Sequence, residues 1–133
     1  MTPAAAPDPD FAASGEHIPP PFSIERLPAP DGVMLLVLEG EMDMASADRF
    51  REHVEEAVDS RPETLVLDVT DVVFMDSSML KELLRTHAEV SGNGGAVVLA
   101  GLQPAVRRLL ELTRTSELFR LADTREAALA DAT

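Results

Sequence analysis

The stretch Phe22-Ser-Ile-Glu-Arg-Leu27, followed by Pro28-Ala-Pro-Asp-Gly32 and Val33-Met-Leu-Leu-Val-Leu38, decides the fold class. Its first segment alternates apolar and polar residues, which is typical of a half-buried strand. The second segment supplies the Pro, Asp and Gly residues of a turn. The third is a continuous apolar run, as expected for a strand that is covered on both faces. We therefore predict an antiparallel hairpin whose second strand is buried in a sheet.

Strand and helix patterns alternate after this hairpin. Further strands are predicted at residues 64–69 and 96–100, with a short one at 118–121. Helices are predicted between the strands, and the capping-box spacing from Asp123 to Glu126 predicts a last short helix. This order implies a single α/β domain with a mixed, mainly parallel sheet, an N-terminal antiparallel hairpin strand and about four helices.

Each of the three longer predicted helices has an apolar face that we expect to be buried. The faces comprise Ala47, Phe50, Val54, Ala57 and Val58 in the first helix, Leu80, Leu83, Leu84 and Ala88 in the second, and Ala105, Val106, Leu109, Leu110 and Leu112 in the third. The second helix should begin near Ser77 and end at Gly92-Asn-Gly-Gly95, while Gln103-Pro104 opens the third.

Proline content divides the chain in two. Eight of the ten prolines lie within residues 1–30, and this bias predicts a flexible Pro/Ala-rich tail over residues 1–21. Residues 22–133 are long enough for one domain with a real core. We expect a cytoplasmic protein, because the N-terminus lacks the basic and apolar regions of a signal peptide and no apolar run approaches a membrane span.

The net charge of the chain, with 11 Lys and Arg against 24 Asp and Glu, is −13. Such a chain repels nucleic acid phosphates and anionic lipid, so neither is an expected partner. The absence of Cys excludes disulfides, zinc thiolate sites and a cysteine nucleophile. Phosphate-binding glycine loops and the GxSxG pattern are also absent. We therefore expect no enzyme activity, no catalytic residues and no cofactor.

Two segments are candidates for a functional surface. In Asp76-Ser77-Ser78, a serine at the start of a helix is most simply a capping residue, but the same helix terminus would tolerate a phosphate carried by the serine itself. Glu39-Gly-Glu-Met-Asp43 is read as an acidic loop after a buried strand. Both segments would lie at the carboxyl edge of the sheet, where such folds usually carry function.

The carboxylates Asp43, Asp68, Asp71 and Asp76 invite comparison with a phospho-accepting receiver domain or a magnesium site. A receiver begins with a strand and a helix and needs a lysine on a late strand. This chain begins with a hairpin, and its one lysine, Lys81, lies on a predicted helix. The acidic residues are better explained as a solvated surface. His17, His53 and His87 show no metal-ligand spacing, so no metal site is expected.

Three motifs follow one another along the chain, namely Gly40-Glu-Met-Asp43, Phe74-Met-Asp-Ser-Ser-Met-Leu80 and Gln103-Pro-Ala-Val-Arg-Arg-Leu-Leu110. In this order they resemble the STAS domain, and more narrowly the bacterial anti-sigma factor antagonists, over residues 22–131. The resemblance implies a non-enzymatic regulator of transcription that acts by partner switching. Unphosphorylated, it would bind an anti-sigma factor, a serine kinase of the histidine-kinase-like ATPase fold, and so release a sigma factor. A PP2C-type phosphatase would reverse the phosphorylation.

By position, the resemblance makes Ser77 the phosphorylation site. The expected partner-binding residues are Glu41, Met42, Asp43, Asp76, Ser77, Ser78 and Met79. The family motif usually has Gly where this chain has Met79, and we predict that Met79 is exposed and contacts the partner, whereas Leu80 faces the core. The alternative is a STAS-type scaffold or small-ligand sensor that binds its partners constitutively and is never phosphorylated.

Overall fold

The predicted hairpin is present in the computed structural model, which describes residues 21–132. Strand β1 (Ser23–Leu27) runs antiparallel to β2 (Val33–Met42). The predicted tail, residues 1–21, lies outside the described residues apart from Pro21, and its flexibility stays a prediction. The turn between the two strands ends at Gly32, whose positive φ of 82° suits a residue without a side chain.

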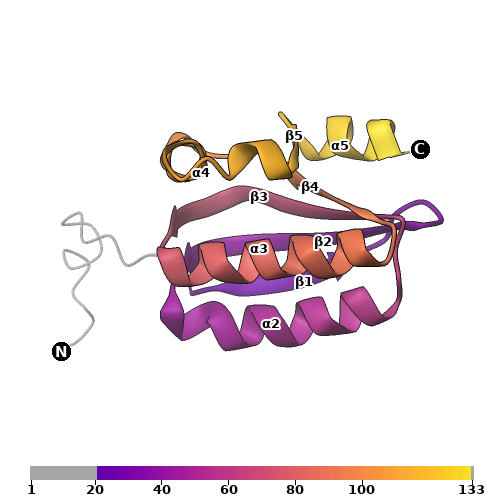
Figure 1. Cartoon of the computed structure of the whole chain (residues 1–133), viewed down its shortest axis with the longest axis horizontal. Coiled ribbons are helices and arrows are strands. Elements are labelled where there is room, and N and C mark those ends of the chain that lie inside the picture. The colour runs from indigo at the N-terminus through magenta and orange to yellow at the C-terminus, as the bar shows by residue number, and fades with distance from the viewer. Residues whose placement is uncertain (1–20, 133) are drawn as a thin grey trace, which may run out of the picture.

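The other elements follow the predicted alternation. They are α2 (Met44–Asp59), β3 (Thr64–Met75), α3 (Ser77–Gly92), β4 (Ala96–Ala100), α4 (Pro104–Leu112), the 3₁₀ turn η1 (Ser116–Leu118), β5 (Arg120–Ala122) and α5 (Arg125–Ala132). The strands of residues 21–132 form one sheet in the order β1-β2-β3-β4-β5 (Figure 1). All neighbouring pairs except β1 and β2 are parallel, which confirms the predicted mixed α/β fold.

Helices cover both faces of this sheet. On one face α2, α3 and α4 enclose the larger core, in which Phe50, Leu83 and Leu99 have no exposed surface. On the other face α5 packs Ala128 against a smaller cluster that includes Leu35 and Val66. Burying each of the large side chains contributes roughly 1.5–3 kcal/mol, so the two clusters fix the helices on the sheet.

Two strands are longer than predicted. The segment 39–43, expected to be a loop, continues β2 as far as Met42, and β3 extends from the predicted 64–69 to Met75. The two strands stay paired because register shifts after Val37 and Gly40 absorb the extra residues. Gly40 permits this with a φ of 99°. As a result, β2 and β3 end at the same level, with Met42 opposite Met75.

Some predicted core positions are wrong. Ala88, Ala105 and Leu112 are exposed, whereas the other residues of the three predicted apolar faces are buried or half-buried. Predicted cap positions also shift by one residue. Asp76, not Ser77, caps α3, and the Thr124 hydroxyl accepts the Ala127 N–H at the start of α5, so the cap there is not Asp123.

Candidate functional site

The aligned ends of β2 and β3 place two helix starts side by side. Asp43 follows Met42 and caps α2, while Asp76 follows Met75 and caps α3. The Asp76 N–H donates to the Met42 carbonyl over 3.1 Å, which joins the two strand ends directly. Two carboxylates and two helix N-termini therefore meet at the carboxyl edge of the sheet, as the sequence predicts.

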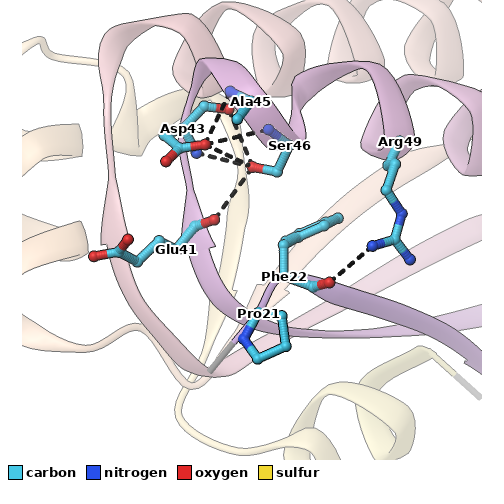
Figure 2. Close-up of a pocket in the computed structure, with 7 residues that line it drawn as sticks. All are labelled: Pro21, Phe22, Glu41, Asp43, Ala45, Ser46 and Arg49. Carbon is cyan, nitrogen blue, oxygen red and sulfur yellow. Dashed lines mark hydrogen bonds between the residues drawn. The ribbon is translucent and has the colours of Figure 1, made fainter. Parts of the chain in front are cut away.

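The start of α2 is held by a reciprocal pair of hydrogen bonds. The Asp43 carboxylate accepts the Ala45 and Ser46 N–H groups at 2.9 and 3.2 Å, and the Ser46 hydroxyl accepts the Asp43 N–H at 2.9 Å. That hydroxyl also lies 3.2 Å from the Glu41 carbonyl oxygen (Figure 2). These bonds fix Asp43 in place before any partner binds.

The start of α3 leaves Ser77 accessible. The Asp76 carboxylate accepts the Met79 N–H at 3.1 Å, which makes Ser77 the first residue of the helix instead of its cap. Ser77 is exposed and Ser78 is half-buried. In residues 21–132 the N–H groups of Ser77 and Ser78 have no hydrogen-bond partner, so both can still receive an acceptor.

Met79 is fully buried, with 0% of its surface exposed, and the prediction that it is exposed is wrong. It is the third residue of α3 and packs in the larger core. Met42, also expected to contact a partner, is likewise buried, and its part in this site is the backbone bond to Asp76. Leu80 is buried as predicted. Of the expected partner-binding side chains, Met79 and Met42 are therefore hidden, and Glu41, Asp43, Asp76, Ser77 and Ser78 are exposed or half-buried.

Three apolar side chains border this site and were not predicted from the sequence. Met44, the first residue of α2, is 74% exposed, and Phe74, near the end of β3, is 46% exposed next to Val73. Val73 and Phe74 are exposed because β3 continues for seven residues beyond Asp68, its last residue paired with β4. In the sequence, only the position of Val73 and Phe74 just before Asp76 connects them with the site. It did not reveal their exposure, because an apolar residue before a helix normally belongs to the core.

A surface pocket of about 270 Å³ adjoins the Asp43 cap. It is lined by Pro21, Phe22, Glu41, Asp43, Ala45, Ser46 and Arg49 (Figure 2). The Arg49 guanidinium donates to the Phe22 carbonyl over 3.0 Å and lies 5.7 Å from the centre of the Phe22 ring. The Arg49 guanidinium therefore already has partners in this pocket, and the Glu41 side chain points away from Arg49 and Phe22 (Figure 2).

Asp68 is not part of a solvated acidic surface, contrary to the prediction. It is buried, and its carboxylate accepts the Thr70 hydroxyl at 2.6 Å and the Arg125 Nε–H at 2.7 Å. Burial alone raises the pKa of Asp68, but the hydrogen bonds from Thr70 and Arg125 together outweigh it, so the pKa lies below its usual range. Asp68 therefore anchors the start of α5 to β3.

A second ion pair joins the two helices of the site. Arg51 on α2 contacts Glu82 on α3 through two hydrogen bonds of 2.7 and 3.2 Å. The hydrogen bond from Arg51 lowers the pKa of Glu82, against the opposing effect of burial. Because α2 carries Asp43 and α3 carries Ser77, this pair helps to fix their relative position.

Histidines and carboxylates are the side chains in the described part of the chain that could bind a metal ion. Among residues 21–132 no three His, Asp or Glu side chains converge as ligands. His53 and His87 lie on different helices, where the first contacts the Arg49 carbonyl and the second packs against Phe119, while His17 lies outside the described residues. No helix of residues 21–132 combines the length and apolar content that crossing a membrane requires.

Comparison with known proteins agrees with this architecture. The STAS domain model matches residues 26–128. An anti-sigma F factor antagonist of Paenibacillus polymyxa is 31% identical over 101 residues, which cover 75% of this chain and 86% of that protein. The crystal structure of an anti-sigma factor antagonist from Mycobacterium paratuberculosis superposes with a TM-score of 0.72 at 32% identity, covering 82% of this chain and 93% of the other.

A more distant solved structure shares the fold. The Bacillus cell fate determinant SpoIIAA in its phosphorylated form matches with a TM-score of 0.68 at 19% identity, covering 84% of this chain and all of that one. The match of the family model to most of the described residues, together with the relative of 31% identity, shows the family. The chain therefore belongs to the STAS domain family.

Proposed function

We propose that this chain is an anti-sigma factor antagonist that binds an anti-sigma factor through the surface around Ser77 and releases it when Ser77 is phosphorylated. The observation that carries the proposal is that Ser77, the first residue of α3, is exposed. Its neighbour Asp76 donates its N–H to the Met42 carbonyl, which places Ser77 beside the α2 cap Asp43. Relatives of this chain are named anti-sigma factor antagonists, which supports the class of partner.

The unphosphorylated surface suits a protein partner. Met44, Val73 and Phe74 are exposed on the elements that end or begin beside Ser77. Exposed apolar side chains beside a polar group are typical of interaction sites. An uncharged serine hydroxyl among them can be covered by a partner at little electrostatic cost. Met44 and Phe74 thus take the role that the sequence had assigned to Met79.

Phosphorylation would change the charge of this surface more than its shape. A phosphoserine adds about −1.5 to −2 charges at pH 7, and at Ser77 it would lie next to Asp76 and near Asp43. The free N–H groups of Ser77 and Ser78 and the helix dipole compensate part of this charge, typically by about 0.3–1 kcal/mol. The fold is therefore expected to survive the modification.

A partner that had covered the serine would have to desolvate the phosphate next to two carboxylates. An uncompensated buried charge costs several kcal/mol, and every 1.4 kcal/mol is a tenfold change in affinity. Loss of binding therefore needs no large conformational change. By the family resemblance, the kinase is the anti-sigma factor itself, which has the histidine-kinase-like ATPase fold. A PP2C-type phosphatase then restores the serine hydroxyl. Binding, phosphorylation and release take place in the cytoplasm.

The proposal is tested by a phosphorylation assay, which uses the kinase that co-purifies with this protein from the cytoplasm of its native cells. Wild-type protein and Ser78→Ala should each incorporate one phosphate from ATP, whereas Ser77→Ala should incorporate none. Ser78→Ala is the matched control, because it removes the adjacent hydroxyl from the same helix turn. Normal labelling of Ser77→Ala would refute the assignment of the site, whereas no labelling of the wild-type protein would favour the constitutive scaffold.

A further inference from the structure

The exposed large apolar side chains of residues 21–132 form two groups. Met44, Val73 and Phe74 border the site described above. Leu112, Leu118 and Leu121 lie instead on the consecutive elements α4, η1 and β5. Leu112 is 70% exposed although it ends a helix whose other face is buried. The proposed function does not use this second group.

The charge of this second surface is opposite to that of the molecule. Residues 103–121 contain four Arg and two Glu, a net charge of +2, so with −13 for the whole chain the remaining residues carry −15. The four arginines are Arg107, Arg108, Arg114 and Arg120, and within residues 21–132 none of their side chains makes an ion pair or a hydrogen bond. We call Leu112, Leu118 and Leu121 with Arg108 and Arg114 the basic apolar patch.

Arg108 and Arg114 lie near the exposed leucines. Arg108 precedes Leu112 by one helical turn and therefore shares its side of α4. Arg114 follows the helix with a φ of 60°, a left-handed conformation in which a residue with a side chain is strained. The Thr115 N–H donates to the Leu110 carbonyl, which holds the residue before η1 against the end of α4, and the Leu118 N–H donates to the Thr115 carbonyl within the turn.

The chain itself supplies a segment of complementary chemistry. Residues 1–20 contain Asp8, Asp10 and Glu16 but no Lys or Arg, and they include the apolar residues Phe11 and Ile18. We propose that this acidic N-terminal segment docks in cis on the basic apolar patch. Its carboxylates would lie near Arg108 and Arg114, and its apolar residues would cover the exposed leucines.

The length of the segment allows this contact. Phe22, whose carbonyl is held by Arg49, precedes β1 at one edge of the sheet, and β5 forms the opposite edge. Five strands about 4.8 Å apart span about 19 Å, whereas twenty extended residues reach up to about 65 Å. A tethered segment has an effective concentration in the millimolar range, so even weak docking is populated.

The experiment uses the full chain, which has no native Cys to interfere. A nitroxide label on Ala12→Cys should broaden the amide signals of Leu112, Arg114 and Leu118 roughly twofold or more, since a docked tether keeps the label close. The amides of Met44, Phe74 and Ser77 should stay sharp. The broadening should weaken at 0.5 M NaCl because the attraction is partly electrostatic.

Arg114→Gly and Arg61→Gly form a matched pair of variants. Both arginines are exposed and left-handed, with φ of 60° and 51°, so glycine relieves strain and removes one charge at either position. Neither variant should lower the melting temperature. Only Arg114→Gly should reduce the broadening, because Arg61 lies between α2 and β3, outside the patch.

Three results would overturn the proposal. The first is no broadening at the basic apolar patch, and the second is broadening that Arg114→Gly leaves unchanged. The third is found in a mixture of ¹⁵N protein without spin label and ¹⁴N protein with it. If the patch signals broaden there as much as in the spin-labelled ¹⁵N protein, the segment docks between molecules and not within one.

Discussion

At the scale of single residues, the neighbouring side chains Asp76 and Ser77 have different roles in the site. Asp76 accepts the Met79 N–H and so positions the turn, while Ser77 remains exposed with a free N–H. Ser and Asp are both good capping residues, and the sequence alone does not show which of two adjacent ones accepts the hydrogen bond. The structure separates the capping role from the role proposed for Ser77.

Met79 is expected to matter for stability instead of for partner contact. Met79→Gly, which introduces the glycine usual in the family, removes a fully buried side chain from the larger core. The loss should be about 2–5 kcal/mol for the cavity plus about 1 kcal/mol for glycine in a helix. Urea unfolding measures the change. Met79→Leu, which nearly conserves volume, should cost less than about 1.5 kcal/mol, and an equal loss in both variants would contradict the packing role.

At the scale of elements, β2 and β3 explain why the two helix starts coincide. Both strands extend beyond their predicted ends, and Met42 pairs with Met75. The extension of β2 was not predicted from the sequence, because Glu39, Gly40 and Glu41 are residue types that are depleted in strands and favour loops. In the structure, strand pairing overrides that preference, and the positive φ of Gly40 absorbs a register shift.

Two substitutions of Asp43 separate the contribution of its capping hydrogen bonds from the contribution of its negative charge. Asp43→Asn keeps an acceptor for the Ala45 and Ser46 N–H groups, whereas Asp43→Ala removes it. We expect Asp43→Ala to lose about 0.5–2 kcal/mol of stability and Asp43→Asn much less. Thermal unfolding of the two variants measures the difference. Equal stability would show that the hydrogen bonds at this helix start contribute nothing measurable.

At the scale of the whole molecule, two ion pairs tie helices to the rest of the fold. Asp68 and Arg125 join α5 to β3, and Glu82 and Arg51 join α3 to α2. Neither pair was predicted, because hydrophobic periodicity indicates which face of an element is buried but not which charged residues pair across elements. The succession of strands and helices along the chain and the mixed, mainly parallel sheet were predicted correctly, since they follow from local patterns and from the hairpin.

These two carboxylates predict how stability depends on pH. Folding lowers the pKa of both Asp68 and Glu82, so the stabilisation is fully present above their unfolded pKa values of about 4. It is lost as the pH falls through the lower folded values. Thermal midpoints should therefore decrease from pH 6 to pH 3. The double variant Asp68→Asn and Glu82→Gln should be less stable at pH 6 and should show a shallower decrease, and parallel curves would contradict this account.

The affinity of the anti-sigma factor for phosphorylated and unphosphorylated protein tests the central claim most directly. Calorimetry with the purified partner should show at least about a hundredfold weaker binding after stoichiometric phosphorylation of Ser77, which corresponds to about 2.7 kcal/mol. Ser77→Ala treated with the kinase should keep the affinity of the unphosphorylated protein, and all forms should have nearly the same melting temperature. Equal affinity of the phosphorylated and unphosphorylated proteins would contradict the switch and leave a constitutive scaffold as the explanation.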